Sequence, residues 1–480
     1  MELSKPLVVD LDGTLIRTDL LYETFVRAFF AKPWIILLIP FWLMLGRVQL
    51  KKRIFRAGGL EPSDVPLNDE LIDYLGEQYH QGRDIVLCTG SWHEAAEKVA
   101  MKFTFFSSVF GSNGTINLTG KTKAQFLVDL YGQQGFTYIG NEVKDLEIWK
   151  YAKSAIVVGG SPQLLSKVRK FCDVEKEISE TSSKLRVILK QIRVHQWTKN
   201  LLIFVPLITS HQAGSMSHLF ASITAFVSLS LCASATYILN DLSDLDSDRK
   251  HATKKYRPLA SGDISISKGM IFAGALFLGS FILASQLPAW FTWSLVLYVC
   301  ITLSYSFKFK KMQTIDIIIL ATLYTLRIIS GALAVEITPS FWLLTFSMFA
   351  FLCLALIKRI SEIIKNLDSD SDSVSLVGRG YYVTDLSVLL NLAASSGIVS
   401  ILVFSMYINS PDVINLYAHP HFLWLICPLF GYWVIRVIVM ASRGQIDEDP
   451  IVFAIKDWRS WIAAALALII IFLASNDRSI

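Results

Sequence analysis

The stretch YILNDLSDLDSDRKHATKKYRPLASG, residues 237–262, ends an apolar run with an acidic cluster and continues directly into a basic one. Four aspartates fall within residues 241–248, and five Lys or Arg residues follow within 249–257. Carboxylates crowded near hydrocarbon repel one another and are costly to desolvate, so such a cluster needs a compensating cation. A hard divalent ion such as Mg²⁺ takes oxygen ligands and bridges to substrate phosphates. The stretch therefore predicts a metal and phosphate site at a membrane surface.

The acidic residues have a helical spacing. Positions 240, 244 and 248 would share one face of a continuing helix. The residues expected to bind the metal are Asn240, Asp241, Asp244 and Asp248. The donors expected for the phosphates are Lys254, Lys255 and Arg257. The alternative is a solvated loop of mixed charge, but the spacing, the membrane depth and the adjacent basic run together favour the metal site.

The composition separates two domains. The 480-residue chain is 53% hydrophobic and only 18% charged. Up to about residue 180, strands and helices alternate with polar loops, which predicts a soluble α/β domain over 1–180. Apolar runs of bilayer-spanning length then recur, so an all-α membrane domain is expected over 181–480. About nine spans are expected, at approximately 201–212, 219–239, 269–287, 289–307, 314–333, 340–357, 387–408, 422–440 and 459–475.

Lysine and arginine are unevenly distributed between these spans. They occur before the first span and in alternate loops after it, and the intervening loops contain none; the empty loops are 209–218, 286–288, 334–339 and 409–421. The positive-inside rule then places the soluble domain and the basic loops in the cytoplasm and the C-terminus outside, which predicts a multi-pass protein of the inner membrane. The net charge of +5 suits an anionic membrane surface and gives no reason to expect nucleic acid.

The aspartate stretch resembles a known motif. With His251, Thr253, Pro258, Ser261 and Gly262, it resembles the aspartate motif of the UbiA superfamily of intramembrane prenyltransferases, and more narrowly the decaprenyl-phosphate phosphoribosyltransferase branch. The resemblance covers roughly 190–460. It extends to QWTKN (196–200), YSFxFK (305–310), Asp316, LRxxxG (326–331), KRxxE (358–362) and GxxxxDP (444–450).

This resemblance implies a reaction and its substrates. The branch transfers 5-phosphoribose from phosphoribosyl diphosphate to a polyprenyl phosphate within the bilayer, with Mg²⁺ bound at the aspartates. The acceptor is a phosphate monoester, so it needs cations rather than a strong base. Arg327 lies inside an otherwise apolar span, where a charge indicates function. The candidates for binding substrate are Lys199, Lys310, Arg327, Lys358 and Arg359. Each alone has the alternative of a simple positive-inside flank, and Arg327 is the least ordinary of them.

The sequence departs from the aromatic and quinone-forming UbiA members in one motif. Aromatic and quinone-forming UbiA members carry a second DxxxD motif, but Asp316 is followed by Leu320 at the required position. The acidic run at 368–372 lies in a polar, serine-rich segment that is expected to be solvated. The missing second motif favours the phosphoribosyl branch over enzymes that ionise a prenyl diphosphate.

The soluble half contains a nucleophile motif, VVDLDGTL, at 8–15. Asp10 at the end of a strand would be a nucleophile, and Asp12 would be its acid/base partner. The motif resembles the first motif of the haloacid dehalogenase (HAD) superfamily, and this resemblance implies further roles. Thr89 would bind phosphate, Lys123 or else Lys121 would be the phosphate-binding lysine, and the metal ligands would be Asp10, Asp12 and Asp145 with Mg²⁺. Asn141 stands where many members have aspartate.

The soluble half is expected to form a doubly wound, mostly parallel sheet with its site at the carboxyl ends of the strands. The segment at about 17–82 is long enough for a helical cap. It contains an apolar stretch, 32–45, that is too short to span a membrane and is expected to lie in or on it. A buried cap core is the alternative.

These features predict a bifunctional membrane enzyme. The membrane half would make polyprenyl-phosphoryl-5-phosphoribose, and the HAD half would remove its 5-phosphate. Two other functions stay open: a UbiA-type prenyltransferase joining a prenyl diphosphate to an aromatic or other small acceptor, and a cation transporter with a regulatory soluble domain. The sequence leaves the prenyl length and the oligomeric state open.

Overall fold

The computed structural model describes residues 5–59, 65–114, 116–178, 184–210, 212, 214–367, 380–446 and 449–475. The acidic run at 368–372 lies outside these residues. The chain divides into two compact units. The first is Met1–Ile192 with Tyr237–Gly274, and the second is Arg193–Thr236 with Ala275–Ile480. The aspartate stretch therefore folds in the same unit as the N-terminal domain.

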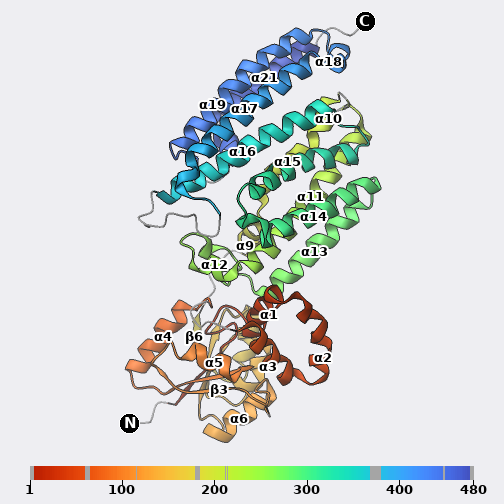
Figure 1. The fold of residues 1–480 in the computed structure, drawn as a ribbon. Coiled ribbons are helices and arrows are strands. Elements are labelled where there is room, and N and C mark those ends of the chain that lie inside the picture. The colour runs from red at the N-terminus through yellow and green to blue at the C-terminus, as the bar shows by residue number, and fades with distance from the viewer. Residues whose placement is uncertain are drawn as a thin grey trace. The chain divides into compact units, whose positions relative to one another are not determined.

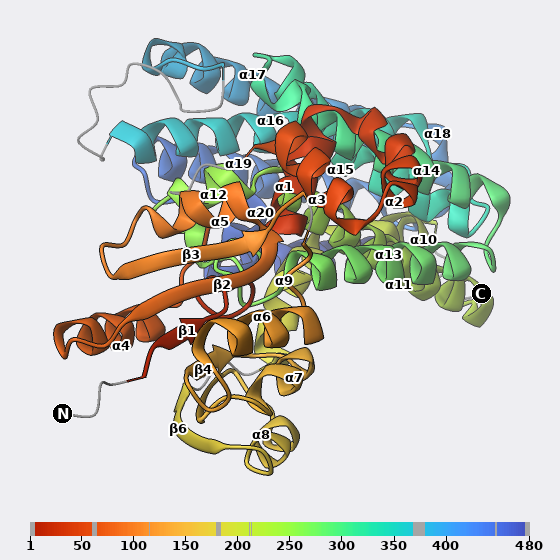
Figure 2. The ribbon, with the colours of Figure 1, turned by 90° about the horizontal axis from the view of Figure 1, so that it is seen from below.

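The N-terminal half is built on a six-stranded parallel sheet with the order β3-β2-β1-β4-β5-β6 (Figures 1 and 2). Its strands are β1 (Leu7–Val9), β2 (Ile85–Trp92), β3 (Phe106–Ser112), β4 (Thr137–Gly140), β5 (Ser154–Val158) and β6 (Asp173–Ile178). The expected doubly wound parallel sheet is confirmed. Because all strands run the same way, the residues that follow β1, β2 and β4 meet at one edge.

Both faces of the sheet are covered by helices, which is why its central strands are continuous apolar runs. Leu7 and Val9 point to one face, where α4 (Asp69–His80) and α5 (His93–Ala100) pack. Val8 points to the other face. The helices of that second face are α6 (Lys121–Tyr131), α7 (Leu146–Trp149) and α8 (Pro162–Val168).

A helical cap interrupts the sheet domain between β1 and β2. Its elements are α1 (Leu20–Ala31), η1 (Pro33–Leu38), α2 (Ile39–Met44) and α3 (Arg47–Gly58). They share a small core of their own, made by Ala28, Ile35, Trp42 and Ile54. Helix α4 also falls within the range expected for the cap, but it packs on the sheet.

The apolar stretch of the cap is largely exposed. Trp34, Ile36, Leu37, Phe41 and Met44 present between 50% and 86% of their surfaces. This exposure argues against the alternative of a fully buried cap core, because only Ile35 and Trp42 of the stretch reach the interior. The neighbouring helix α3 is basic (RVQLKKRIFRAG). An apolar surface beside a basic one is the pattern of a helix that rests on a membrane.

Eight helices in the described part of the chain are long and apolar enough to cross a membrane, so the chain is a multi-pass membrane protein. They are α11 (Met216–Ser243), α13 (Ile266–Ala284), α14 (Ala289–Phe307), α15 (Ile315–Ala334), α16 (Phe341–Leu367), α17 (Leu386–Ile408), α19 (Ile426–Ser442) and α21 (Trp458–Ser475). Small residues allow close packing between them. Ser228 and Ser280 each donate to the other's backbone carbonyl oxygen, at 2.9 and 2.8 Å.

The ninth expected span, 201–212, does not form a helix of spanning length. Its residues belong to a 3₁₀ helix, η4 (Val194–Phe204), and a five-residue helix, α10 (Val205–Thr209). A 3₁₀ helix rises about 2.0 Å per residue, so the two segments together extend about 30 Å, close to the hydrocarbon thickness. They pack along α15, where a Cβ at Gly331 would lie 2.1 Å from the Ile203 carbonyl oxygen. The ninth span was expected from the apolar composition of this run, which does not show that the run breaks into two short helices.

Candidate functional site

The nucleophile motif places Asp10 directly after β1, in contact with a lysine from α6. Lys123 Nζ donates to Asp10 Oδ1 at 2.7 Å and to the Tyr138 hydroxyl at 3.0 Å. Burial lowers the pKa of Lys123, but the Asp10 carboxylate raises it by more, so the lysine stays charged. Of the two lysines considered, the structure brings Lys123 to the nucleophile, while Lys121 is exposed.

Asp12 is the second carboxylate of the motif. Its Oδ1 accepts from the Leu20 amide at 2.9 Å, and its Oδ2 accepts from Ser91 Oγ at 2.6 Å and Thr89 Oγ1 at 3.3 Å. Burial raises the pKa of Asp12 to about 7, and the nearby Asp19 carboxylate adds to the shift. A carboxyl group with this pKa holds a proton near neutral pH, as a general acid must.

Asn141 and Asp145 lie in the loop after β4, and their side chains have different partners. Asp145 Oδ2 accepts from the amides of Asn141 and Glu142, at 3.0 and 2.9 Å, and its Oδ1 accepts from Tyr138. The Asp145 carboxylate therefore binds the backbone of its own loop and stabilises the conformation of residues 141–145. Asn141 lies against the nucleophile motif, since a Cβ at Gly13 would be 2.3 Å from Asn141 Nδ2. Its Oδ1 is buried and has no hydrogen-bond donor among the described residues, so it is an acceptor available to a cation.

A cap lysine that sequence analysis did not single out also reaches this site. Lys51 Nζ, on α3, donates to the Gly90 carbonyl at 2.5 Å and to Asn117 Oδ1 at 2.9 Å. Burial lowers the pKa of Lys51, and the carboxylates of Asp12 and Asp19 partly oppose that shift. It lies in a basic run in which spacing does not distinguish it from Lys52. The site therefore has one cation from the sheet domain and one from the cap.

The aspartate stretch keeps its helical face across a break. Helix α11 ends at Ser243, and α12 (Leu245–Lys250) begins after Asp244. The amide of Asp244 still donates to the Asn240 carbonyl, and the amide of Asp248 donates to the Asp244 carbonyl. The spacing of four residues is therefore preserved, and Asn240, Asp244 and Asp248 follow one another along this face.

Two of these carboxylates converge on a single cationic nitrogen. Arg257 Nη1 lies 2.6 Å from Asp248 Oδ2 and 3.2 Å from Asp241 Oδ1, and both aspartates are buried. Gln191 Nε2 donates to the other oxygen of Asp241. Burial raises the pKa of Asp248, and Arg257 opposes that shift. The pair thus already surrounds a positive charge, which is the environment that a divalent ion requires.

The site around Asp10 and the site around Asp241 and Asp248 each have few carboxylates that could bind a metal ion. Among the described residues, no three His, Cys, Asp or Glu side chains meet in metal-binding geometry. Each site instead offers two aspartates together with amide or backbone oxygens. That donor set suits Mg²⁺, which usually binds one or two carboxylates and keeps several waters.

The second unit brings two of the predicted cations to one carboxylate. Lys199, on η4, forms a buried ion pair with Asp449, and Lys358 Nζ, on α16, lies 3.8 Å from the same carboxylate. Burial raises the pKa of Asp449, but Lys199 and Lys358 lower it by more. Two cations sharing one carboxylate leave an excess positive charge that could be met by an anion. Among the other predicted cations, Lys254 and Lys255 are exposed, and Lys310 is half-buried.

Arg359 is fully buried and neutralised by the protein itself. Its Nε donates to Asp316 Oδ2 at 2.6 Å, its Nη1 pairs with Glu362, and its Nη2 donates to the Tyr305 hydroxyl at 2.8 Å. Tyr381 donates to the other Asp316 oxygen. Since two carboxylates surround one guanidinium, this arrangement favours a structural role for Arg359 over direct binding of an anion.

Arg327 is buried in a different environment. Its Nε donates to Asn200 Oδ1 at 2.9 Å, its Nη1 donates to the Leu323 carbonyl at 2.6 Å, and its Nη2 approaches the Tyr298 hydroxyl at 3.4 Å. The guanidinium also lies over the rings of Tyr298 and Tyr324. Within the described residues no carboxylate forms an ion pair with it. Arg327 is therefore a desolvated cation held by neutral groups, which suits an anionic ligand.

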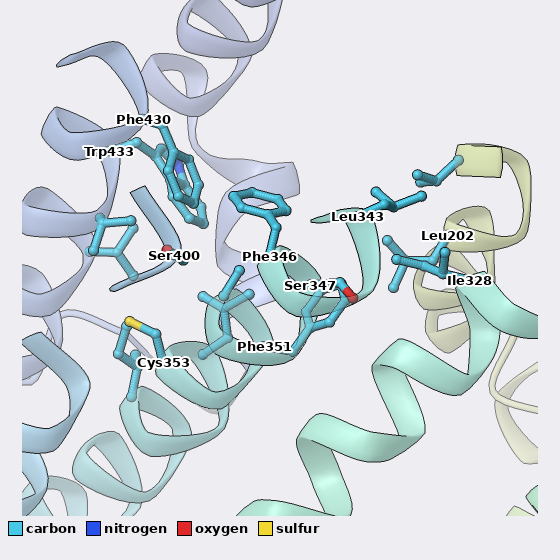
Figure 3. A pocket seen from close by; sticks show the side chains of 16 residues that line it. Leu202, Ile328, Leu343, Phe346, Ser347, Phe351, Cys353, Ser400, Phe430 and Trp433 are labelled. Carbon is cyan, nitrogen blue, oxygen red and sulfur yellow. The ribbon is translucent and has the colours of Figure 1, made fainter. Parts of the chain in front are cut away.

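An apolar cavity of about 240 Å³ lies in the same unit (Figure 3). Its lining begins at Leu202, two residues after Asn200, and at Ile328, next to Arg327. Phe346, Phe430 and Trp433 close the side opposite Leu202 and Ile328. The cavity thus adjoins the segments that carry the buried cations, an arrangement suited to a molecule with an anionic head and an apolar tail.

Comparison with known proteins matches both halves. The model of the UbiA prenyltransferase family matches residues 201–372. The chain is 34% identical over 465 residues to protein y4nM of Sinorhizobium fredii, covering 96% of this chain and 89% of that protein. It is 32% identical over 181 residues to a decaprenyl-phosphate phosphoribosyltransferase of Mycolicibacterium smegmatis, covering 37% of this chain and 57% of that enzyme. A substrate-bound phosphoserine phosphatase structure, 18% identical, covers 40% of this chain and 98% of its own, with a TM-score of 0.27.

Asp12→Asn should change how the stability of the full chain depends on pH in metal-free buffer. The folded state holds the Asp12 proton with a pKa of about 7, against an ordinary 3.8, so folding loses stability as pH rises between these values. An asparagine cannot ionise and avoids that loss, which amounts to about 2–4 kcal/mol at pH 8. Thermal unfolding at pH 5 and pH 8 should show the variant gaining relative to the intact protein only at the higher pH. The same difference at both pH values would contradict a neutral, buried Asp12.

The two buried arginines should respond oppositely to replacement by leucine. Arg359→Leu strands the carboxylates of Asp316 and Glu362 and should destabilise the membrane half by about 3–5 kcal/mol. Arg327→Leu leaves only neutral groups behind and should be neutral or stabilising. Thermal unfolding in detergent compares them directly. Equal losses of stability in the two variants would show that Arg327 is structural.

Proposed function

We propose that the membrane half, whose residues 201–372 match the UbiA prenyltransferase family, transfers 5-phosphoribose from phosphoribosyl diphosphate to a polyprenyl phosphate, and that the N-terminal half is a HAD-type phosphatase. The single observation that carries this proposal is Arg327, a buried guanidinium held by neutral partners, in a unit that also has an apolar cavity lined by the neighbouring residue Ile328. A phosphate monoester on a long prenyl chain matches both parts. The similarity to the mycobacterial transferase points to the same acceptor class.

The membrane-half residues have distinct roles in this reaction. Arg327 binds the acceptor phosphate, and Lys199 and Lys358 add positive charge for it. The first isoprene units occupy the apolar cavity, and the rest of the tail continues into lipid. An oxygen of the acceptor phosphate forms the new bond to the anomeric carbon of ribose. The bond from that carbon to diphosphate breaks, and its electron pair leaves with the diphosphate.

The donor is bound by the aspartate stretch. Asp241 and Asp248, with Asn240 and Asp244 along the same face, would hold Mg²⁺, which neutralises the charge of the leaving diphosphate. Arg257 already lies between two of these carboxylates and can turn its guanidinium to the diphosphate oxygens. No general base is needed, because the acceptor phosphate is ionised at neutral pH.

The HAD half hydrolyses the 5-phosphate of the lipid product. Asp10 attacks phosphorus and forms an aspartyl phosphate, while the protonated Asp12 gives its proton to the leaving 5′-oxygen. Water then cleaves the aspartyl phosphate, with Asp12 as the base. Lys123 and Lys51 stabilise the phosphoryl charge. Mg²⁺ would be held by Asp10, Asp12 and Asn141, with Asp145 fixing the Asn141 loop.

The location of the two reactions follows from the lipid product. A polyprenyl tail keeps that product in the bilayer, so the phosphatase must work at the membrane surface. The exposed apolar residues of the cap, next to basic α3, provide a surface for that purpose. The distribution of Lys and Arg between the spans supports a cytoplasmic location for this surface and for the N-terminal unit.

Asp248→Asn should reduce transfer at least 100-fold, because it removes one of the two carboxylates that converge on the cation site. The assay measures diphosphate release by the detergent-solubilised protein with radiolabelled phosphoribosyl diphosphate, a polyprenyl phosphate and Mg²⁺. Asp246→Asn is the matched control, since Asp246 lies off the helical face and is 45% exposed. Absence of transfer by the intact protein, with turnover of a prenyl diphosphate instead, would replace the proposal with the prenyltransferase function.

Asp10→Asn should leave transfer intact and cause polyprenyl-phosphoryl-5-phosphoribose to accumulate. The intact protein should yield the dephosphorylated lipid, because the nucleophile is then present. Lipid extraction and mass spectrometry after incubation with both substrates and Mg²⁺ distinguish the two products. If both proteins give the same phosphorylated lipid, the HAD half does not act on it.

A further inference from the structure

The cap of the HAD half and the aspartate stretch are joined by a buried, two-fold ion pair within the first unit. Arg249 Nη1 donates to Glu23 Oε2 at 3.0 Å, and Arg249 Nη2 donates to Glu23 Oε1 at 2.6 Å. The Glu23 side chain is 1% exposed and that of Arg249 is 8% exposed. Paired hydrogen bonds of this kind fix the orientation of both partners as well as their distance.

Close contacts also join the segment after the nucleophile motif to the end of the basic run. A Cβ at Gly262 would lie 2.5 Å from Arg17 Cβ, and the φ of Gly262 is +80°. Arg17 Nη1 also lies 3.8 Å from Asp263 Oδ1. The chain just after the nucleophile motif therefore packs against the end of the basic run. A larger side chain at Gly262 would force the two segments apart.

Arg249 also holds the aspartate stretch together. Its Nε donates to the Ala260 carbonyl at 3.1 Å, so one guanidinium connects α12 to the returning basic run and to the cap. Arg249 directly follows Asp248, one of the two aspartates that converge on Arg257 Nη1. Helix α12 has only six residues and is too short to be stable without such contacts.

The Glu23 carboxylate can be buried because Arg249 pairs with it. Glu23 lies on α1 and is 1% exposed, and burial of a carboxylate is unfavourable unless it is paired. Its partner is separated from it by 226 residues of sequence. The second ion pair between these segments, Arg27 with Asp246, is less buried because Asp246 is 45% exposed, so it contributes little.

We propose that Glu23, although it belongs to the phosphatase cap, is a positioning residue for the transfer reaction. It holds Arg249, and through Arg249 it fixes α12 so that Asp248 faces Asp241 at the distance a shared cation requires. The phosphatase domain is then a structural part of the transferase as well as the enzyme that follows it. This inference rests on the proposed transfer function.

Glu23→Gln tests the proposal in the full chain, because glutamine keeps the shape of glutamate but removes its charge. The Mg²⁺ concentration for half-maximal transfer should rise about 10- to 100-fold, the usual effect of losing a partner that orients a metal ligand. Glu175→Gln is the matched control: Glu175 pairs with Arg83 in the same unit, at 3.3 Å, away from the aspartate stretch. The control should stay within about twofold of the intact protein.

A second measurement needs neither metal nor substrate. The amides of Asp248 and Ser261 donate to the carbonyls of Asp244 and Arg257, so hydrogen exchange at 245–262 reports whether the stretch is held. Glu23→Gln should accelerate exchange there, and Glu175→Gln should not. If Glu23→Gln does not accumulate as folded protein, Glu23→Asp, which keeps the charge on a shorter side chain, should show a smaller shift in the same direction.

Each outcome decides the proposal. If the Mg²⁺ requirement and the exchange at 245–262 are the same in Glu23→Gln and Glu175→Gln, Glu23 has no positioning role. If exchange accelerates while the Mg²⁺ requirement is unchanged, the contact is structural only and the proposal is wrong. If the intact protein does not transfer phosphoribose at all, the proposed function fails, and unchanged exchange would then reject the positioning role separately.

Discussion

A charge that leaves water must find an opposite charge or a full set of hydrogen bonds, and this constraint determines where the polar residues of the chain lie. Lys123 is buried because Asp10 accepts from it, and Arg359 is buried because Asp316 and Glu362 surround it. Arg327 is buried to the same degree but has only neutral acceptors and aromatic rings. The same residue type thus has different partners in two apolar surroundings. Arg359 is neutralised by carboxylates of the protein, and Arg327 is held by neutral groups.

Much of the fold could be predicted from local sequence patterns, which involve residues close to one another in the chain. The apolar run VVD, with a nucleophile motif after it, predicted a central strand ending at a site, and the structure has that strand at the switch point of the sheet order. Eight of the nine expected spans are present as long apolar helices. Length and composition identify an α-helical span reliably, because both follow from the rise per residue and the thickness of the hydrocarbon. They do not show where an apolar run breaks into short helices, as 201–212 does in η4 and α10.

Other features depend on contacts between distant segments, which no local pattern encodes. The orientation of Asp145 is set by amides of its own loop, so the motif alone did not show that Asn141 is the residue lying against Gly13. The neutralisation of Arg359 requires α15 and α16 to be adjacent. Lys51 comes close to the residues around Asp12 only because helix α3 of the cap packs against the segment after β2. In each case the residue type was visible in the sequence, but its partner was not.

The first unit combines two segments that are far apart in the chain, so they are synthesised at different times. Glu23 is synthesised 226 residues before Arg249, and the stretch between them includes the first long apolar helix, α11. At ordinary rates of translation, about 10 to 45 s pass between the two residues. The Glu23 carboxylate therefore has no Arg249 partner until the chain through α11 has been made. Folding of the first unit can be completed only after the first long apolar helix has been synthesised.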